Sequence, residues 1–205
     1  MRKTVLLLAL LGLLVSSSVS AAKPAPSVTI RASRPVVVYG QSVTLSGAIS
    51  SHQAGQTVTL LSEPFAKTAF GNLVTTTTTA HGLWSSLDKP TIQTAYQASW
   101  NGTTSPTVTV KVRPLIALKL VSAATGSFSV TVTGDRSFMG KYVLVERLTS
   151  TGVTILKHVT LDASSSATFT VRLHQRLSRL RAVMPTSQAA PGYITGMSNV
   201  ATVPH

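Results

Sequence analysis

The chain has 205 residues, of which 43% are hydrophobic and only 11% are charged, and it contains no cysteine. Its 18 lysines and arginines against 5 acidic residues give a formal net charge of +13. The patterned apolar content excludes a disordered polyelectrolyte, and the lack of cysteine excludes disulfides and thiolate metal sites.

The first residues have the three-part layout of a secretory signal peptide. Arg2 and Lys3 precede an apolar run at residues 5–15, and small residues follow as far as Ala22. The run is only half as long as the ~20 apolar residues that a membrane span needs. We therefore expect residues 1–22 to be a cleaved signal peptide, with a retained anchor as the alternative. Export without cysteine is common in bacteria, so we expect a bacterial protein that is secreted or associated with the cell envelope.

Short runs with period-2 alternation predict the strands. We expect them at residues 28–32, 42–47, 57–61, 72–79, 83–87, 94–100 and 106–112. Pro35 ends the first strand, as proline does at an edge or where a strand changes sheets. Asn101-Gly102 predicts a tight hairpin, because both residues tolerate positive φ. Short strands separated by turns, with no sustained helical period, predict an all-β sandwich of immunoglobulin type.

The second part of the chain repeats the first with a period of about 87 residues. Residues 130–134 match residues 43–47, and residues 140–146 match residues 55–61. We also match Leu180-Arg181-Ala182 with Tyr96-Gln97-Ala98, and residues 167–169 with residues 82–84. Such a long period is typical of tandem domains and excludes a solenoid.

The predicted domain boundary lies at Arg113-Pro114, where proline makes a stiff, extended joint. We expect a signal peptide at residues 1–22 and two tandem antiparallel Ig-like β-sandwich domains at residues 23–113 and 114–205, held in a fairly fixed, elongated arrangement. The second copy departs from the first at residues 185–198.

Five segments of the first copy together resemble a known family. They are YGQSVTLSG, AGQTVTL, HGLW, TAYQA and SPTVTVKVRP. They resemble the bacterial immunoglobulin-like repeats of secreted actinobacterial proteins, well over residues 28–113 and more loosely over residues 114–203. The resemblance implies an Ig-like fold and an extracellular setting. Its motifs are structural and not catalytic.

The titratable residues show no catalytic or metal-binding spacing. The acids are Glu63, Asp88, Asp135, Glu146 and Asp162, and the histidines are His52, His81, His158, His174 and His205. No G-x-S-x-G segment accompanies them, and no loop gathers the carboxylates that calcium needs. Glu63 and Glu146 occupy equivalent ends of the repeated strand, which favours structural roles. We expect no enzyme, no cofactor and no metal site.

One run of basic residues is the candidate site. Residues 172–181 carry a candidate anion-binding patch of Arg172, His174, Arg176, Arg179 and Arg181 without any acid. Arg179 and Arg181 alternate with apolar residues, so both should point outward from one strand. Guanidinium groups offer paired donors to phosphate or carboxylate. The alternative is a solvated strand face that discourages edge-to-edge aggregation.

These patterns favour an exported binding or spacer protein that attracts an anionic envelope glycopolymer or a protein partner. The alternative is a structural subunit or adhesion-type module of an extracellular assembly. Nucleic acid is disfavoured, because aromatic residues make up only 5% of the chain and none forms a stacking platform beside the arginines.

Overall fold

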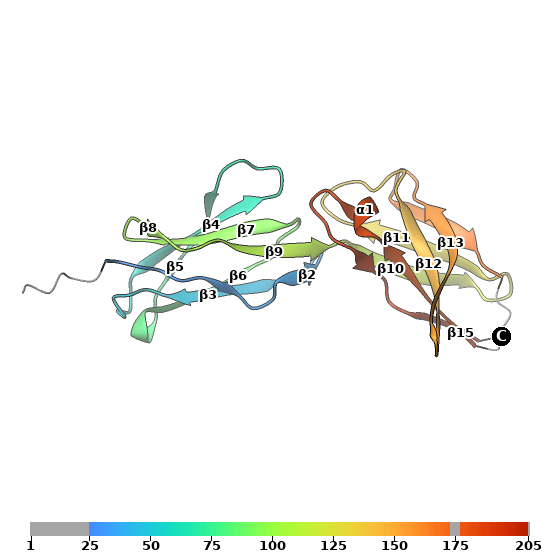
Figure 1. Cartoon of the computed structure of the whole chain (residues 1–205), viewed down its shortest axis with the longest axis horizontal. Coiled ribbons are helices and arrows are strands. Elements are labelled where there is room, and N and C mark those ends of the chain that lie inside the picture. The colour runs from blue at the N-terminus through green and yellow to red at the C-terminus, as the bar shows by residue number, and fades with distance from the viewer. Residues whose placement is uncertain (1–24, 173–176, 205) are drawn as a thin grey trace, which may run out of the picture.

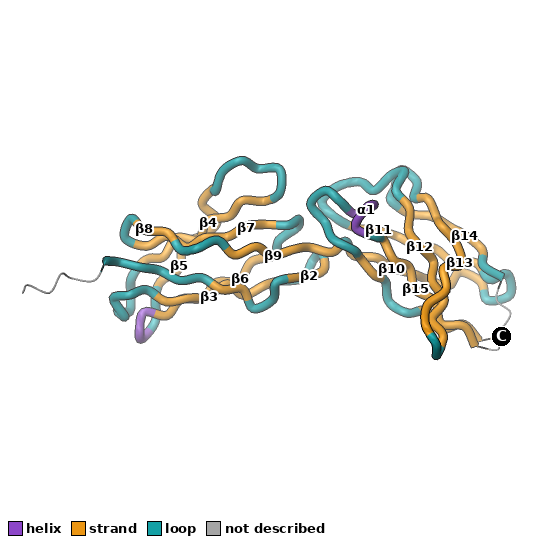
Figure 2. Tube along the Cα trace, viewed as in Figure 1, coloured by secondary structure: helices purple, strands orange, loops and turns teal. Residues whose placement is uncertain are grey.

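The computed structural model of the chain describes residues 25–172 and 177–204, most of which lie in strands. The predicted signal peptide, His174, Arg176 and His205 lie outside the described residues. Figure 2 shows two groups of strands along the long axis, with one helical turn in each group. The all-β sandwich prediction is confirmed. No helix of the described residues is long and apolar enough to cross a membrane.

Residues 28–113, here called the N-terminal half, form two sheets. Their orders are β1-β3-β6 and β2-β9-β7-β4-β5, with β8 paired to β7. The strands are β1 (Arg31–Ala32), β2 (Val36–Val38), β3 (Val43–Ala48), β4 (Thr57–Pro64), β5 (Gly71–Thr77), β6 (Leu83–Asp88), β7 (Thr94–Trp100), β8 (Thr103–Thr104) and β9 (Val108–Arg113), with a 3-10 turn at Ala80–Gly82. The pairs are antiparallel except β2 with β9.

Residues 115–204, the C-terminal half, repeat this plan. One sheet has the order β10-β11-β14, and the other has β13-β12-β15-β16, with β17 also paired to β15. The elements are β10 (Leu115–Ser122), β11 (Ser127–Thr133), β12 (Tyr142–Thr149), β13 (Gly152–Thr160), β14 (Ser166–Thr170), β15 (Leu177–Met184), α1 (Thr186–Ala189), β16 (Gly196–Met197) and β17 (Ala201–Pro204).

The predicted alternation decides which side chains are buried. In β7, Tyr96, Ala98 and Trp100 face the core while the residues between them are half-buried. The Oη of Tyr96 donates to Oδ2 of Asp88 at 2.5 Å, which ties β7 to β6 of the opposite sheet. The buried apolar side chains of both halves form one contiguous cluster.

Two turn predictions are confirmed by the backbone. Pro35 separates β1, which pairs with β3, from β2, which pairs with β9 in the other sheet. The chain therefore changes sheets at this proline. Asn101 and Gly102 have φ values of 48° and 75°, as a type I′ hairpin requires.

The strand registers test the proposed repeat. Leu60 pairs with Ala98 in the first copy, and Val145 pairs with Ala182 in the second. These pairs confirm the match of residues 55–61 with 140–146 and of residues 96–98 with 180–182.

Two finer matches are wrong. Trp84 pairs with Gly47, whereas Phe169 pairs with Phe128, so the two aromatic residues are not equivalent. Glu146 is equivalent to Leu61 and not to Glu63, because Leu61 pairs with Gln97 and Glu146 pairs with Arg181. Glu63 lies two residues further along its strand. The register of β14 on β11 differs from that of β6 on β3, and a match of short sequence motifs cannot detect such a difference.

The segment at residues 185–198, where the second copy departs from the first, folds against the N-terminal half. Gln93 N donates to Gly192 O at 3.0 Å, and Ile194 N donates to Val112 O at 3.0 Å. The Arg113 guanidinium donates to the carbonyl of Thr195. We call this contact the joint. It is formed by residues 91–93 and 112–113 on one side and residues 192–195 on the other.

Tyr193 is the buried centre of the joint, with 3% of its surface exposed. Its Oη donates to Thr91 O at 2.6 Å and accepts from Asp135 N at 2.6 Å. Thr91 Oγ1 donates to Asp135 Oδ2 at 3.1 Å. Burial, with the nearby Asp135 carboxylate, raises the pKa of Tyr193 above the ordinary 10.0.

The two halves lie end to end along the long axis of the molecule (Figure 1). The predicted elongated arrangement is thus present, and hydrogen bonds at the joint hold it in addition to the proline link. The division into domains at residues 113 and 114 remains a prediction, since the apolar cluster continues through both halves.

Candidate binding surface

The structure places the described members of the predicted patch in different environments. Arg172 is exposed just after β14, and Arg179 is exposed on β15. Arg181 is half-buried on the same strand. His174 and Arg176 lie outside the described residues.

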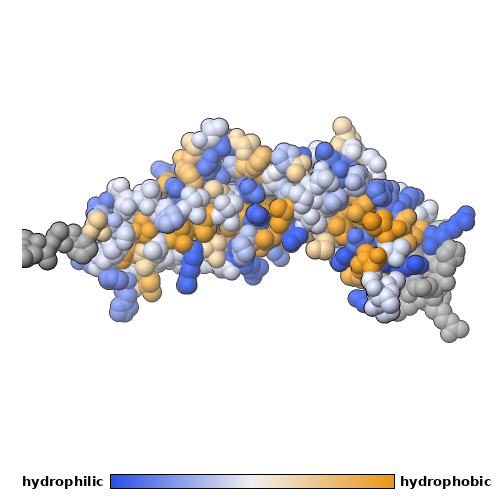
Figure 3. All heavy atoms as spheres, viewed as in Figure 1, coloured by the Kyte–Doolittle hydropathy of each residue, from blue (hydrophilic) through white to orange (hydrophobic). Residues whose placement is uncertain are grey.

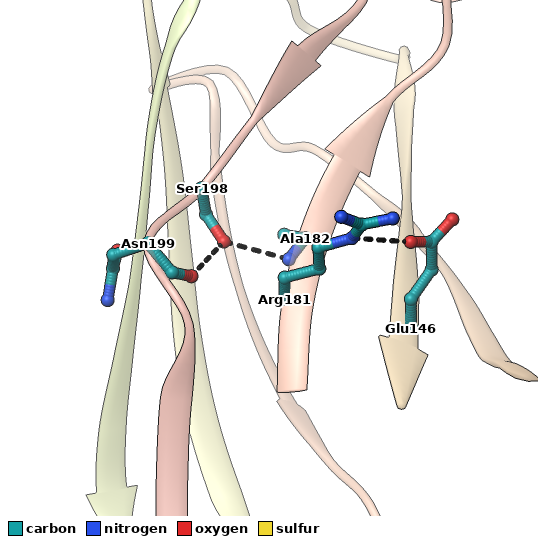
Figure 4. Close-up of polar contacts among 5 residues, drawn as sticks. All are labelled: Glu146, Arg181, Ala182, Ser198 and Asn199. Carbon is teal, nitrogen blue, oxygen red and sulfur yellow. Dashed lines mark hydrogen bonds and ion pairs between the residues drawn. The ribbon is translucent and has the colours of Figure 1, made fainter. Parts of the chain in front are cut away.

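Arg181 is bound to an acid from the neighbouring strand. Its Nε donates to Oε2 of Glu146 on β12 at 2.7 Å, and the side chains are 29% and 12% exposed (Figure 4). Arg181 does point away from the core as predicted, because Arg179 and Arg181 alternate with the buried Leu180 and Ala182. Its charge, however, is already compensated. Arg179 is the β15 arginine left available to an anion.

A polar contact on the other side of β15 fixes this strand to β10. Ser198 Oγ accepts from Ala182 N at 2.9 Å and donates to Asn199 O at 2.6 Å (Figure 4). The Asn199 side chain accepts from Leu118 N at 3.2 Å and donates to Leu118 O at 3.1 Å, as a neighbouring strand would. These hydrogen bonds therefore link β15, the strand that carries Arg179 and Arg181, to β10 of the opposite sheet.

Arg179 and Arg181 lie on what we call the outer face, the side of the β13-β12-β15-β16 sheet that is turned away from the core. Cross-strand neighbours define it in three rows: Met197, Val183, Leu144 and His158; Arg181, Glu146 and Ile155; Arg179, Leu148 and Val153. Six of these ten side chains are aliphatic or methionine, three can carry positive charge, and one is acidic. Glu146 is already paired, so the outer face is both apolar and cationic.

Three apolar side chains of the outer face protrude into solvent. The exposed fractions are 51% for Val153, 53% for Ile155 and 47% for Met197. Figure 3 shows hydrophobic side chains gathered on the C-terminal half among hydrophilic ones. Sequence reasoning missed this surface. The available signal was β12, where Leu144 and Leu148 alternate with the buried Val143 and Val145, so that both faces of the strand are apolar.

Four of the five carboxylates make internal contacts. Asp88 accepts from Tyr96, Asp135 from Thr91, and Glu146 from Arg181. Asp162 accepts from the Ser164 side chain and from backbone amides of its own loop, which lowers its pKa. The ion pair of Arg181 and Glu146 is the one salt bridge found within residues 25–172 and 177–204. The other acids thus leave the cations largely unneutralised.

No group of three or more residues capable of holding a metal ion occurs in the part of the chain that the structure describes. His52 is exposed on a loop of the N-terminal half and His81 is exposed in the 3-10 turn, and His158 stacks on Tyr142 with ring centroids 5.0 Å apart. An open depression of about 620 Å³ lies in the N-terminal half, away from Arg172 and Arg179, and is lined by Ala25, Pro26, Ser50, Ser51, Gln53, Trp100 and Asn101. It carries no charged side chain.

Comparison with known proteins assigns the chain to no family. No family model and no curated protein sequence matches the chain. A tetra-tandem repeat from the extending region of a large adhesion protein is similar over 87% of this chain and 49% of its own, at 16% identity and a TM-score of 0.37. The native conformation of E. coli alpha-2-macroglobulin is similar over 87% of this chain and 14% of its own, at 13% identity and a TM-score of 0.32. The chain thus spans about half the length of the first and a smaller part of the second. The resemblance to actinobacterial repeats rests on the sequence motifs alone.

Proposed function

We propose that the chain is an exported, non-enzymatic Ig-like binding and spacing module of the bacterial cell envelope or extracellular space, and that its cationic surface engages anionic polymers. The observation that carries the proposal is that most carboxylates have partners within the chain, whereas most cationic side chains are exposed to solvent. The carboxylates of Asp88, Asp135, Glu146 and Asp162 are occupied by internal contacts, whereas Arg172, Arg179 and many lysines are exposed.

This imbalance leaves a net positive field over a surface whose other polar groups are mostly hydroxyls and amides. Such a field attracts polyanions and raises their local concentration. Exposed guanidinium groups add paired donors that fit phosphate and carboxylate oxygens. The internal use of the carboxylates also supports the absence of acid–base catalysis, since those groups are occupied by structural partners.

The joint supports the spacing part of the proposal. Backbone hydrogen bonds from Gln93 and Ile194, together with the buried Tyr193, hold the two halves end to end. A linker that only tethered the halves would need none of these contacts. The alternative function, a structural subunit of an extracellular assembly, uses the same rigidity and needs a protein partner in place of a polymer.

The test is the binding of purified protein to fluorescein-labelled polyphosphate, followed by anisotropy at low and physiological salt. Arg172→Ser with Arg179→Ser should weaken binding by about tenfold, and added salt should weaken it steeply for the unchanged protein. The control is Arg34→Ser with Lys111→Ser, which removes two exposed cations from the N-terminal half.

If the control weakens binding as much as the arginine pair does, only the total charge matters and the patch has no special role. Binding that is absent at low salt, or that is indifferent to salt, would remove the polyanion mechanism altogether.

A further inference from the structure

The edge of the sheet that carries the outer face is open. β13 is the last strand in the order β13-β12-β15-β16, and β12 is its one strand partner within residues 25–172 and 177–204. It is nine residues long, and seven of these residues are exposed, all but Leu156 and Val159. Roughly half of its N–H and C=O groups therefore point away from the sheet, and no strand of the described part of the chain meets them.

The equivalent edge of the N-terminal half is different. β5 also ends its sheet, but a hydrogen bond ties it to β6 of the opposite sheet, because Thr76 Oγ1 donates to Ser85 O at 3.2 Å. The two apolar side chains that β5 exposes, Leu73 and Val74, are adjacent in sequence. The shift in the pairing of β4 with β5 falls at Leu73, so these two side chains do not belong to one regular row of cross-strand neighbours. On β13, Val153 and Ile155 are two residues apart and both lie in the rows of the outer face.

We infer that β13 is an acceptor edge for an extended acidic protein segment with alternating aliphatic side chains, which adds to the sheet as its next strand. The backbone of such a segment satisfies the open N–H and C=O groups, and its aliphatic side chains cover Val153 and Ile155. Its acidic residues alternate with the aliphatic ones and therefore point to the other side of the sheet, where the exposed Lys157 lies. The inference rests on the proposed function only in using the same excess of positive charge on the chain.

Other occupants fit the edge less well. A lipid surface could cover Val153 and Ile155, but it offers no partner to the backbone groups of β13 beside them, and such groups are costly to leave unpaired in hydrocarbon. A second copy of the chain could offer a strand, but each copy carries a formal charge of +13, and like charges oppose the contact. A polysaccharide gains little from the exposed aliphatic side chains.

The test uses the full chain and two fluorescein-labelled ten-residue peptides of equal composition. One alternates glutamate with valine, and the other has five glutamates followed by five valines. Fluorescence anisotropy should show binding of the alternating peptide, weakened by about tenfold in Val153→Ser with Ile155→Ser. The matched control, Leu73→Ser with Val74→Ser on β5, should bind as the unchanged protein does. Hydrogen exchange should slow on binding at residues 152–160.

Several results would overturn the inference. Equal binding of both peptides, unchanged by Val153→Ser with Ile155→Ser, would mean plain charge attraction and would leave the proposed function standing. Binding of polyphosphate but of neither peptide would do the same, and failure of all three probes would end both proposals. Capture on vesicles of an anionic and a neutral phospholipid, lost in the same double variant, would assign the face to a lipid surface. A dimer in light scattering, lost in that variant, would assign it to a second copy.

Discussion

The Oη of Tyr193 donates a 2.6 Å hydrogen bond to the backbone carbonyl of Thr91, a residue 102 positions away in the chain. The same oxygen accepts from Asp135 N at 2.6 Å. One buried hydroxyl thus satisfies a carbonyl of the N-terminal half and an amide of the C-terminal half. Loss of this hydroxyl leaves both groups without that partner, which affects the position of the halves as well as the stability of each.

Tyr193→Phe should lower the free energy of unfolding by about 1–3 kcal/mol, because it removes two buried hydrogen bonds and keeps the ring. Small-angle scattering should show a wider range of end-to-end distances. The control is Tyr142→Phe, whose ring stacks on His158 and whose hydroxyl has no hydrogen bond to any other described residue. Equal effects of the two variants would mean that the Tyr193 hydroxyl does not hold the joint.

Gly192→Ala tests the joint through packing. Gly192 has φ +83°, and an added Cβ would lie 2.5 Å from the end of the Ile92 side chain. Gly140 has φ +74°, and an added Cβ there would meet nothing within 4 Å. Both substitutions carry the backbone strain, about 1–2 kcal/mol. Only Gly192→Ala adds a clash across the joint, about 1–3 kcal/mol more by overpacking.

Thermal and urea unfolding of the two alanine variants should therefore differ, with Gly192→Ala the less stable. Scattering should show an altered joint for Gly192→Ala only. A Gly140→Ala variant that is as unstable as Gly192→Ala would attribute the whole effect to backbone strain.

Local sequence patterns correctly predicted the features that depend only on residues close together in the chain. The alternation around Tyr96 gave the buried face of β7, and Asn101-Gly102 gave its hairpin, because side-chain period and turn chemistry are local properties. The repeat even aligned Leu60 and Val145 with their strand partners correctly.

Pairing between distant segments could not be predicted in the same way. The contact of Tyr193 with Thr91 depends on how the two halves dock, which no local period encodes. Phe169 pairs with Phe128 through a register that differs from the one in the first copy. For the candidate surface, the sequence located the arginines, but the engagement of Arg181 by Glu146 depends on the β12–β15 register.

Arg179 and Arg181 should respond differently to the same substitution. Arg181→Ser leaves the carboxylate of Glu146, which is 12% exposed, without its charged partner. Because the pair is only partly buried, the loss should be about 1–2 kcal/mol, below the cost of a fully buried pair. Arg179→Ser removes an exposed side chain and should change stability by less than about 0.5 kcal/mol.

Urea unfolding of the two single variants measures this difference in stability. Polyphosphate binding measures the difference in their affinity for an anion. Arg179→Ser should weaken binding more than Arg181→Ser, since the Arg181 charge is already compensated. The reverse order of binding losses would mean that the anion displaces Glu146 from Arg181.

Stability should fall at alkaline pH because of two buried tyrosines. Burial, together with the hydrogen bond to Asp88 and its charge, raises the pKa of Tyr96 well above the ordinary 10.0. Burial raises the pKa of Tyr193 as well. Below pH 10 both tyrosines keep their protons in the folded and the unfolded chain, so their full contribution to the free energy of unfolding is present. Above pH 10 the unfolded chain loses protons that the folded chain retains, which favours unfolding.

Each tyrosine should therefore lower the free energy of unfolding by up to about 1.4 kcal/mol per pH unit above pH 10. Urea unfolding followed by tryptophan fluorescence between pH 8 and pH 11 measures the slope. Tyr193→Phe should remove one tyrosine's share of it. A slope that is the same in the unchanged protein and in Tyr193→Phe would mean that Tyr193 ionises as readily in the folded chain as in the unfolded one, and that its hydroxyl is not held neutral by the joint.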